Sequence, residues 1–106
     1  MLRPFFVWQN RVLKKLHPED VICLSTEGNY TRIYLKDKSY HMVRSTLSAA
    51  LKKLPADIFI KIHRSFAVSV DHIDSIHKDY LLVSNETLPI GKQYYRSLIE
   101  KLNVIE

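Results

Sequence analysis

Apolar and polar residues alternate along much of this chain, and the pattern is clearest in residues 59–73, which read FIKIHRSFAVSVDHI. Two apolar runs, residues 59–62 and 66–70, flank the polar triplet His63-Arg64-Ser65. Alternation with a period of two is what a strand needs to bury one face. The pattern predicts two strands joined by a short polar connection on a rigid scaffold, which suits an outward contact surface. On residue types alone, a solvated turn with Arg64 paired to a carboxylate is the simpler interpretation.

The same reasoning predicts further strands on both sides of this stretch. They are expected at residues 5–8, 11–16, 21–24, 30–36, 40–43, 73–76, 80–84 and 88–91. The first two form a hairpin across a turn at Gln9-Asn10, and the next three form a meander. Turns at residues 77–79 and 85–87 separate the later strands, and Pro89 restricts the last one to a sheet edge.

Two segments show helical rather than strand spacing. After Ser45 or Thr46, either of which can cap a helix, apolar residues recur at helical intervals until Pro55 ends the pattern. Residues 92–103 repeat the helical spacing and follow Gly91. Strands still dominate the chain, so we predict a mostly β, sandwich-like fold with one short mid-chain helix and one C-terminal helix.

Length and composition limit the architecture. A chain of 106 residues suffices for a modest core, so residues 1–106 are expected to form a single domain. The single Cys23 cannot form an internal disulfide, which fits a reducing compartment. No apolar run approaches the roughly 18 residues of a membrane helix, and the opening MLRPFFVWQNR is charged too early for a signal peptide. A cytoplasmic location is therefore expected.

Patterns for catalysis or metal binding are not evident. The carboxylates are scattered over predicted turns, where solvation is their ordinary state. The five His residues lack metal-ligand spacing, and one Cys cannot complete a Cys-rich zinc site. The sequence has neither a Gly-rich phosphate loop nor a GxSxG elbow, and Cys23 lies in an apolar run typical of a core strand. We therefore expect no enzyme activity and no cofactor.

Charge favours a polyanionic partner. Sixteen Lys and Arg residues against eleven Asp and Glu residues leave a formal net charge of +5. Three polar, basic segments interrupt the apolar pattern, at residues 27–32, 61–65 and 91–96. Their Arg, Lys, Asn, Gln and His side chains can contact base edges or phosphates. The segments are predicted to lie on loops and strand ends, because no basic amphipathic helix for a DNA groove is evident.

Two other binding functions stay open on the residues alone. Tyr30 and Tyr34 share one strand face and could stack on the bases of RNA or single-stranded nucleic acid, although cross-strand packing is the simpler explanation of these rings. The basic surface could instead meet an acidic partner protein, and binding would then be insensitive to DNA sequence.

Four segments carry a family resemblance: VICLSTEGNYTRIYL, RSTLSAALKKLP, FIKIHRSFAVSVDHIDSI and LPIGKQYYRSLIEKL. Their order resembles the LytTR DNA-binding domain, most closely over residues 21–102. The resemblance implies an elongated arrangement of small antiparallel sheets that forms the output half of bacterial response regulators in two-component systems. It also implies sequence-specific binding to direct-repeat sites in double-stranded DNA, with loops in successive major grooves and bending of the duplex. A receiver or sensor domain in the full-length protein and pairing on DNA are further implications.

The resemblance assigns contacts within the three basic segments. The expected base contacts are Asn29, Tyr30, Thr31, Arg64, Lys92 and Gln93. The expected phosphate or positioning contacts are Arg32, His63, Ser65 and Arg96. For His63, packing through a hydrogen bond to the backbone is an equal alternative. The sequence departs from the family pattern at Ser69, where Asn is common, and at Gly91-Lys92-Gln93, where Ser followed by two basic residues is more usual.

Overall fold

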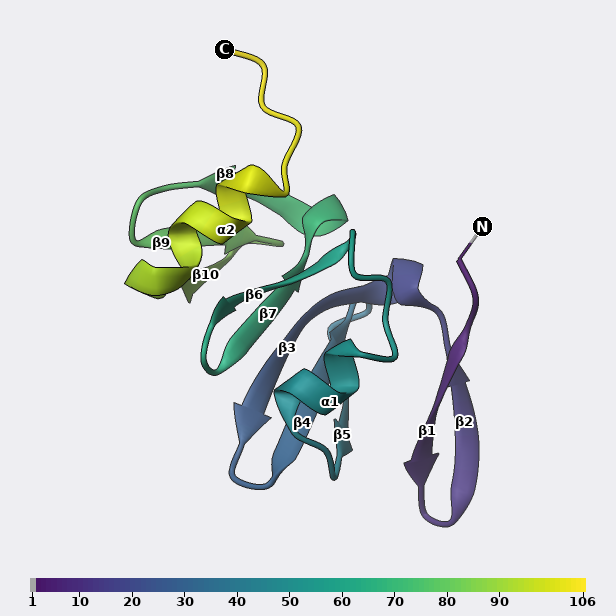
Figure 1. Cartoon of the computed structure of the whole chain (residues 1–106). Coiled ribbons are helices and arrows are strands. Elements are labelled where there is room, and N and C mark those ends of the chain that lie inside the picture. The colour runs from purple at the N-terminus through teal and green to yellow at the C-terminus, as the bar shows by residue number, and fades with distance from the viewer. Residues whose placement is uncertain (1) are drawn as a thin grey trace.

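The structure, a computed structural model, describes residues 2–106 and contains three antiparallel sheets (Figure 1). A two-stranded sheet pairs β1 (Phe5–Gln9) with β2 (Val12–Leu16). A five-stranded sheet has the order β5 (Tyr40–Val43), β4 (Tyr30–Leu35), β3 (Val21–Glu27), β7 (Phe66–Ser69) and β6 (Phe59–His63). A three-stranded sheet has the order β10 (Glu86–Pro89), β9 (Tyr80–Val83) and β8 (Ile73–Ile76). The predicted mostly β fold of small antiparallel sheets is confirmed.

Two short α-helices, α1 (Leu47–Leu51) and α2 (Tyr95–Glu100), complete the fold. Three 3-10 helices connect the elements, at Pro18–Asp20, Val70–His72 and Lys92–Tyr94. The molecule is elongated, with extents of 47 × 32 × 24 Å. The β1–β2 hairpin stands at one side, and the three-stranded sheet with α2 lies at the other (Figure 1). None of the helices within residues 2–106 is long and apolar enough to cross a membrane.

Two apolar clusters cover the two faces of the five-stranded sheet at its strands β3, β7 and β6, whereas the outer face of β4 and β5 is partly exposed. Ala67 of β7 packs with the hairpin and the α1 segment, whereas the next residue, Val68, packs with the three-stranded sheet and α2. Both side chains are 0% exposed. Because consecutive side chains of a strand point to opposite faces, β7 is a central strand between two layers. The alternating sequence pattern by itself indicated only one buried face.

Two predicted turns need correction. The β1–β2 turn is Asn10-Arg11 rather than Gln9-Asn10, and both residues have positive φ, at 51° and 65°. A two-residue turn with this backbone matches the twist of its flanking strands. The turn before β10 is Ser84-Asn85, also with positive φ at both positions. Glu86 and Thr87, which were expected in the turn, therefore belong to β10.

Several element ends also differ from the expectation. The strand predicted at 21–24 continues to Glu27, since its polar second half pairs with β4. The strand predicted at 66–70 ends at Ser69, where a 3-10 helix begins. The helix predicted at 92–103 is divided into a 3-10 turn and α2. Thr46, and not Ser45, caps α1, since the Ala49 N–H donates to its Oγ1 at 3.1 Å.

Cys23 on β3 provides a test of this packing, because it is only 9% exposed between the five-stranded and three-stranded sheets. Burial first, and the negative charge of Glu86 second, raise the pKa of its thiol from 9.0 to about 11. We expect folded protein at pH 8 to resist alkylation until urea unfolds it. The unfolded chain releases this proton first, so stability should fall between about pH 9 and pH 11.

The measurement is urea unfolding across that pH window, compared with a Cys23→Val variant. The variant should lack this component of the pH dependence. Rapid alkylation of the folded wild-type protein at pH 8 would contradict the assigned burial of the thiol.

Candidate nucleic-acid interface

Backbone hydrogen bonds join the three basic segments. The Thr26 N–H, just before the first segment, donates to the Ser65 carbonyl at 3.0 Å. The Gly91 N–H, at the start of the third segment, donates to the Ile62 carbonyl at 2.8 Å. The central β6–β7 connection therefore contacts both neighbours directly. Segments that are about thirty residues apart in the chain form one continuous surface.

The first segment is the β3–β4 turn and the start of β4. Gly28 has a φ of 58°, which the turn requires and a glycine adopts without strain. Asn29 is exposed beside it, and Tyr30 is 41% exposed. Thr31 is 0% exposed, and its hydroxyl donates to the Ser45 carbonyl at 2.8 Å. The expectation of a base contact from Thr31 is therefore corrected: its side chain points inward and ties β4 to the segment before α1.

Arg32 is already engaged within the protein. Its guanidinium lies 3.3 Å from a Glu27 carboxylate oxygen and 3.5 Å from the Tyr34 hydroxyl, to which it donates. The same group lies 5.0 Å from the centre of the Tyr40 ring. These contacts hold Arg32 on the outer face of β4, with its side chain 29% exposed. This geometry fits a role for Arg32 in holding the β3–β4 turn in place better than a role as a mobile side chain that contacts a partner.

The second segment is built around His63. Its Nδ1 accepts a hydrogen bond from the Ser65 N–H at 3.0 Å, so the neutral ring carries its proton on Nε2. The ring also packs against Phe66 with centroids 5.6 Å apart. His63 thus shapes the turn, while Arg64 at its tip is exposed and Ser65 is half-buried.

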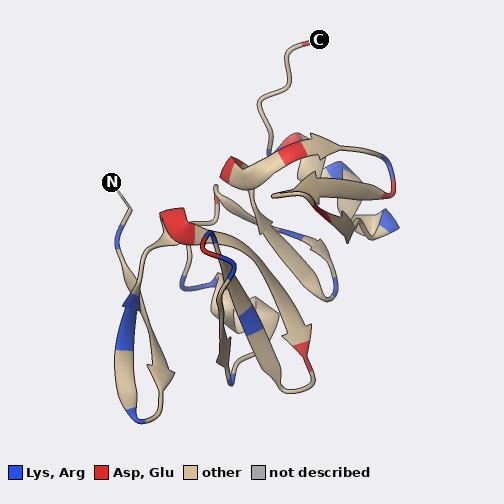
Figure 2. Cartoon of the chain, turned by 180° about the vertical axis from the view of Figure 1, so that it is seen from behind, with Lys and Arg blue, Asp and Glu red and all other residues tan. Residues whose placement is uncertain are grey.

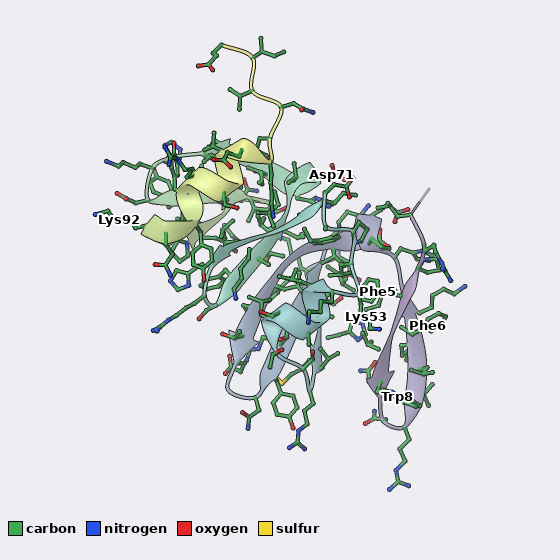
Figure 3. All side chains as sticks on the ribbon, viewed as in Figure 1. Phe5, Phe6, Trp8, Lys53, Asp71 and Lys92 are labelled. Atoms are coloured by element: carbon green, nitrogen blue, oxygen red, sulfur yellow. The ribbon has the colours of Figure 1, made fainter. Side chains whose placement is uncertain are left out.

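The third segment is pressed closely against the second. A Cβ on Gly91 would lie 2.8 Å from Cδ2 of Tyr94 and 3.7 Å from the Cα of His63. A side chain at Gly91 would therefore collide with the Tyr94 ring of the same segment, while the contact with His63 would be an ordinary van der Waals contact. Lys92, Gln93 and Arg96 are all exposed, and Lys92 projects from the end of the molecule that carries α2 (Figure 3).

Two cations that the sequence reasoning did not assign lie beside Arg64. Arg44, Lys61 and Arg64 line one open groove of about 620 Å³, together with Asn29 and Tyr30. The Lys61 ammonium also donates to the Ser48 hydroxyl at 3.5 Å. Lys61 belongs to a basic segment already recognised, so its position was available from sequence. Arg44 precedes the helix cap and carried no such signal.

No group of three or more His, Cys, Asp or Glu side chains within residues 2–106 is placed to hold a metal ion. The chemistry of the surface is that of exposed cations, amides and a tyrosine. Such groups donate hydrogen bonds to phosphates and to the acceptors of base edges.

The fold and this surface define a β-rich module with a basic face built from loops. Residues 11–103 match the family model of the LytTr DNA-binding domain, LytTR, and the chain belongs to this family. A LytTr DNA-binding domain from Bacillus cereus has the same fold, with a TM-score of 0.81 at 23% identity over 95% of this chain and 97% of that chain.

Similar full-length proteins are sensory transduction proteins. LytT of Enterococcus faecalis is 31% identical over 93 residues, which are 82% of this chain and 38% of that protein. LytT of Bacillus subtilis is 32% identical over 92 residues, covering 81% of this chain and 38% of that protein. LytR of Staphylococcus epidermidis is 42% identical over 57 residues, covering 54% and 22%. The chain spans less than two fifths of the length of these relatives.

The His63 hydrogen bond can be tested directly. We expect His63→Ala to lower stability by about 1 kcal/mol and to speed hydrogen exchange at the Ser65 amide, because that N–H loses its acceptor. His63→Asn, whose side-chain oxygen can accept the same bond, is the matched control and should retain most of the protection. Equal protection of the Ser65 amide in wild type and His63→Ala, measured by NMR, would show that His63 does not hold the turn.

Proposed function

We propose that this domain binds double-stranded DNA in a sequence-specific manner, as the DNA-binding part of a bacterial transcription regulator. One observation carries the proposal: backbone hydrogen bonds join three basic loops into one exposed surface, in a chain of the LytTR family. The positive net charge favours the same partner, because cations that neutralise phosphates release counterions and supply much of the affinity.

Base contacts are assigned to the exposed amide and guanidinium groups. Asn29 and Gln93 can each bond an adenine in two places, and Arg64 can bond a guanine in the same manner. Tyr30 lines the same groove as Asn29 and Arg64 and is 41% exposed, so it can contact a sugar or a base. Thr31 is left out of this group because it has no exposed surface.

Phosphate and positioning contacts form the second group. They are Arg32, His63, Ser65 and Arg96. We place Lys92 here rather than among the base contacts, because a Lys ammonium binds phosphate as a point charge, and we add Arg44 and Lys61 because they line the same groove as Arg64. Among these, Arg32 and His63 act mainly by holding the loops, given their contacts within the protein.

The mode of binding that we propose follows the family resemblance. Loops enter successive major grooves of a direct-repeat site, and bending of the duplex adds indirect readout. Two copies would pair on such a site, and a receiver or sensor domain would accompany this one in a full-length cytoplasmic regulator. Support for the accompanying domain comes from the much greater length of the LytT relatives.

Stacking of single-stranded bases receives less support. Tyr34, one of the two rings required, packs against Tyr40 with centroids 5.6 Å apart, and its hydroxyl accepts from Arg32. A ring that packs against a second ring and is tied through its hydroxyl is less free to stack on a base.

Selection of bound duplexes from a random pool tests the proposal as a whole. We expect enrichment of a direct repeat, as the family resemblance implies, with each copy of the domain bound to one of two similarly oriented half-sites. Anisotropy titration of the selected and a scrambled duplex at several salt concentrations should then give a specific-to-random ratio that persists as salt rises. A lack of enrichment, with binding that vanishes at higher salt, would contradict sequence-specific recognition.

Alanine substitutions of Arg64 and Lys92 should change DNA binding in different ways. Arg64→Ala should reduce discrimination between the selected and scrambled duplexes by about 1–3 kcal/mol, the range of one good bidentate base contact. Lys92→Ala should weaken both duplexes alike and lower the slope of log affinity against log salt by about 0.9, the value for one phosphate contact. An unchanged specific-to-random ratio for Arg64→Ala would remove this residue from base recognition.

A further inference from the structure

The β1–β2 hairpin forms a basic arm that is not part of the proposed interface of three loops. The first eighteen residues contain no Asp or Glu but carry Arg3, Arg11, Lys14 and Lys15, all exposed in the structure. Seen from behind, the hairpin shows basic residues along one strand and at its tip and no acidic residue (Figure 2). The nearest acids in the chain lie past its base, where Asp20 pairs with Lys36 at 3.2 Å.

The arm is held firmly in place. Val7 and Leu16 on its inner face are 7% and 9% exposed and belong to the same apolar cluster as Leu47 and Leu54. Its tip is the tight Asn10-Arg11 turn. Arg11 is therefore carried at the end of a two-stranded ribbon that is packed on the core through Val7 and Leu16, and not on a loose terminus. A charge held in place loses less conformational entropy when it meets a partner.

The tip of the hairpin also lies at the same end of the molecule as part of the proposed DNA interface. The turn of the hairpin, the β3–β4 turn and the connection from β5 to α1 all lie at the same end (Figure 1). The last two hold Asn29 and Arg44 of the proposed interface. A duplex that extends past the base-contacting loops at this end would approach the cations of the arm.

We propose that the β1–β2 hairpin contacts the phosphate backbone of DNA that flanks the base-contacting site, with Arg11 foremost and one of Lys14 and Lys15, which lie on opposite faces of β2, behind it. This inference rests on the proposed function. Charge selects the partner, because a ribbon with three cations, Arg11, Lys14 and Lys15, and no anion repels a second copy of itself and attracts a polyanion. Strand β1 lies outside the matched family region, which begins at residue 11. Flanking contact would lengthen the site without adding base preference.

Arg11→Gly is the most direct test, since Asn-Gly is the preferred sequence of this turn and the hairpin should stay folded. The test uses the shortest duplex that keeps full base preference, called the core duplex, and two longer duplexes that extend it on one side or on the other. We expect Arg11→Gly to bind one of the two extended duplexes severalfold more weakly than wild type does. Its salt slope on that duplex should fall by about 0.9. Binding to the core duplex should be unchanged.

Three matched variants complete the experiment. Arg11→Lys keeps the charge and should behave as wild type. Lys78→Gln removes an exposed cation from the distant β8–β9 turn and should not distinguish the two duplexes. Lys14→Gln combined with Lys15→Gln should repeat the loss on the extended duplex without changing the turn.

Trp8, the only tryptophan, is 67% exposed on this hairpin and gives an independent readout (Figure 3). Its emission should change more with the extended duplex than with the core duplex. The proposal would be overturned if Arg11→Gly matched wild type on the extended duplex, or if it weakened both duplexes equally. Equal emission changes with both duplexes would count against it in the same way.

These outcomes are separable from a failure of the proposed function. Wild-type protein that binds selected and scrambled duplexes equally would contradict sequence recognition. The salt slope of Arg11→Gly on a long scrambled duplex would still decide the hairpin contact, because phosphates carry no sequence information.

Discussion

The antiparallel pairing of β3 with β7 is the constraint on which the rest of this structure depends. It places Leu24 opposite Ala67 and Ser25 opposite Phe66, although the strands lie more than forty residues apart in the chain. Through this ladder the N-terminal meander and the β6–β7 hairpin become one sheet, with an apolar layer on each face. Burial on both faces leaves the ends of these strands, rather than their surfaces, as the places where polar side chains reach solvent.

The proposed interface follows from that arrangement. Because β3 and β7 run in opposite directions, the end of β3 meets the start of β7, which brings the β3–β4 turn beside the His63-Arg64-Ser65 connection. Gly91 is joined to the same connection through its N–H, which donates to the Ile62 carbonyl at 2.8 Å. Three loops are thus held by the core and by two backbone hydrogen bonds. A rigid surface of this kind loses little conformational entropy on binding, so its cations and amides can act with most of their intrinsic strength.

Charge has two different roles in this molecule. Arg64, Arg44 and Lys61 face one open groove and are placed for a polyanion, whereas Arg32 is neutralised within the protein by Glu27 and packs over Tyr40. A count of basic residues treats these cations alike. The neighbouring side chains distinguish a cation that can contact DNA from one that supports the fold. The β1–β2 hairpin contains no acidic residue that could neutralise its cations.

The sequence by itself determined which segments form strands and helices, since period-two alternation, helical spacing and Pro55 act over a few neighbours at a time, but it misplaced two turns by a residue and several element ends. It also located the three basic segments and Arg64 at the tip of a turn. Only the tertiary structure decided that Thr31 is buried against Ser45, that His63 accepts the Ser65 N–H, and that Arg44 joins the groove. Each of these depends on which strands pair and how the turns close in space. A residue pattern cannot supply that information, because exposure is set by what lies opposite a side chain and not by its own type.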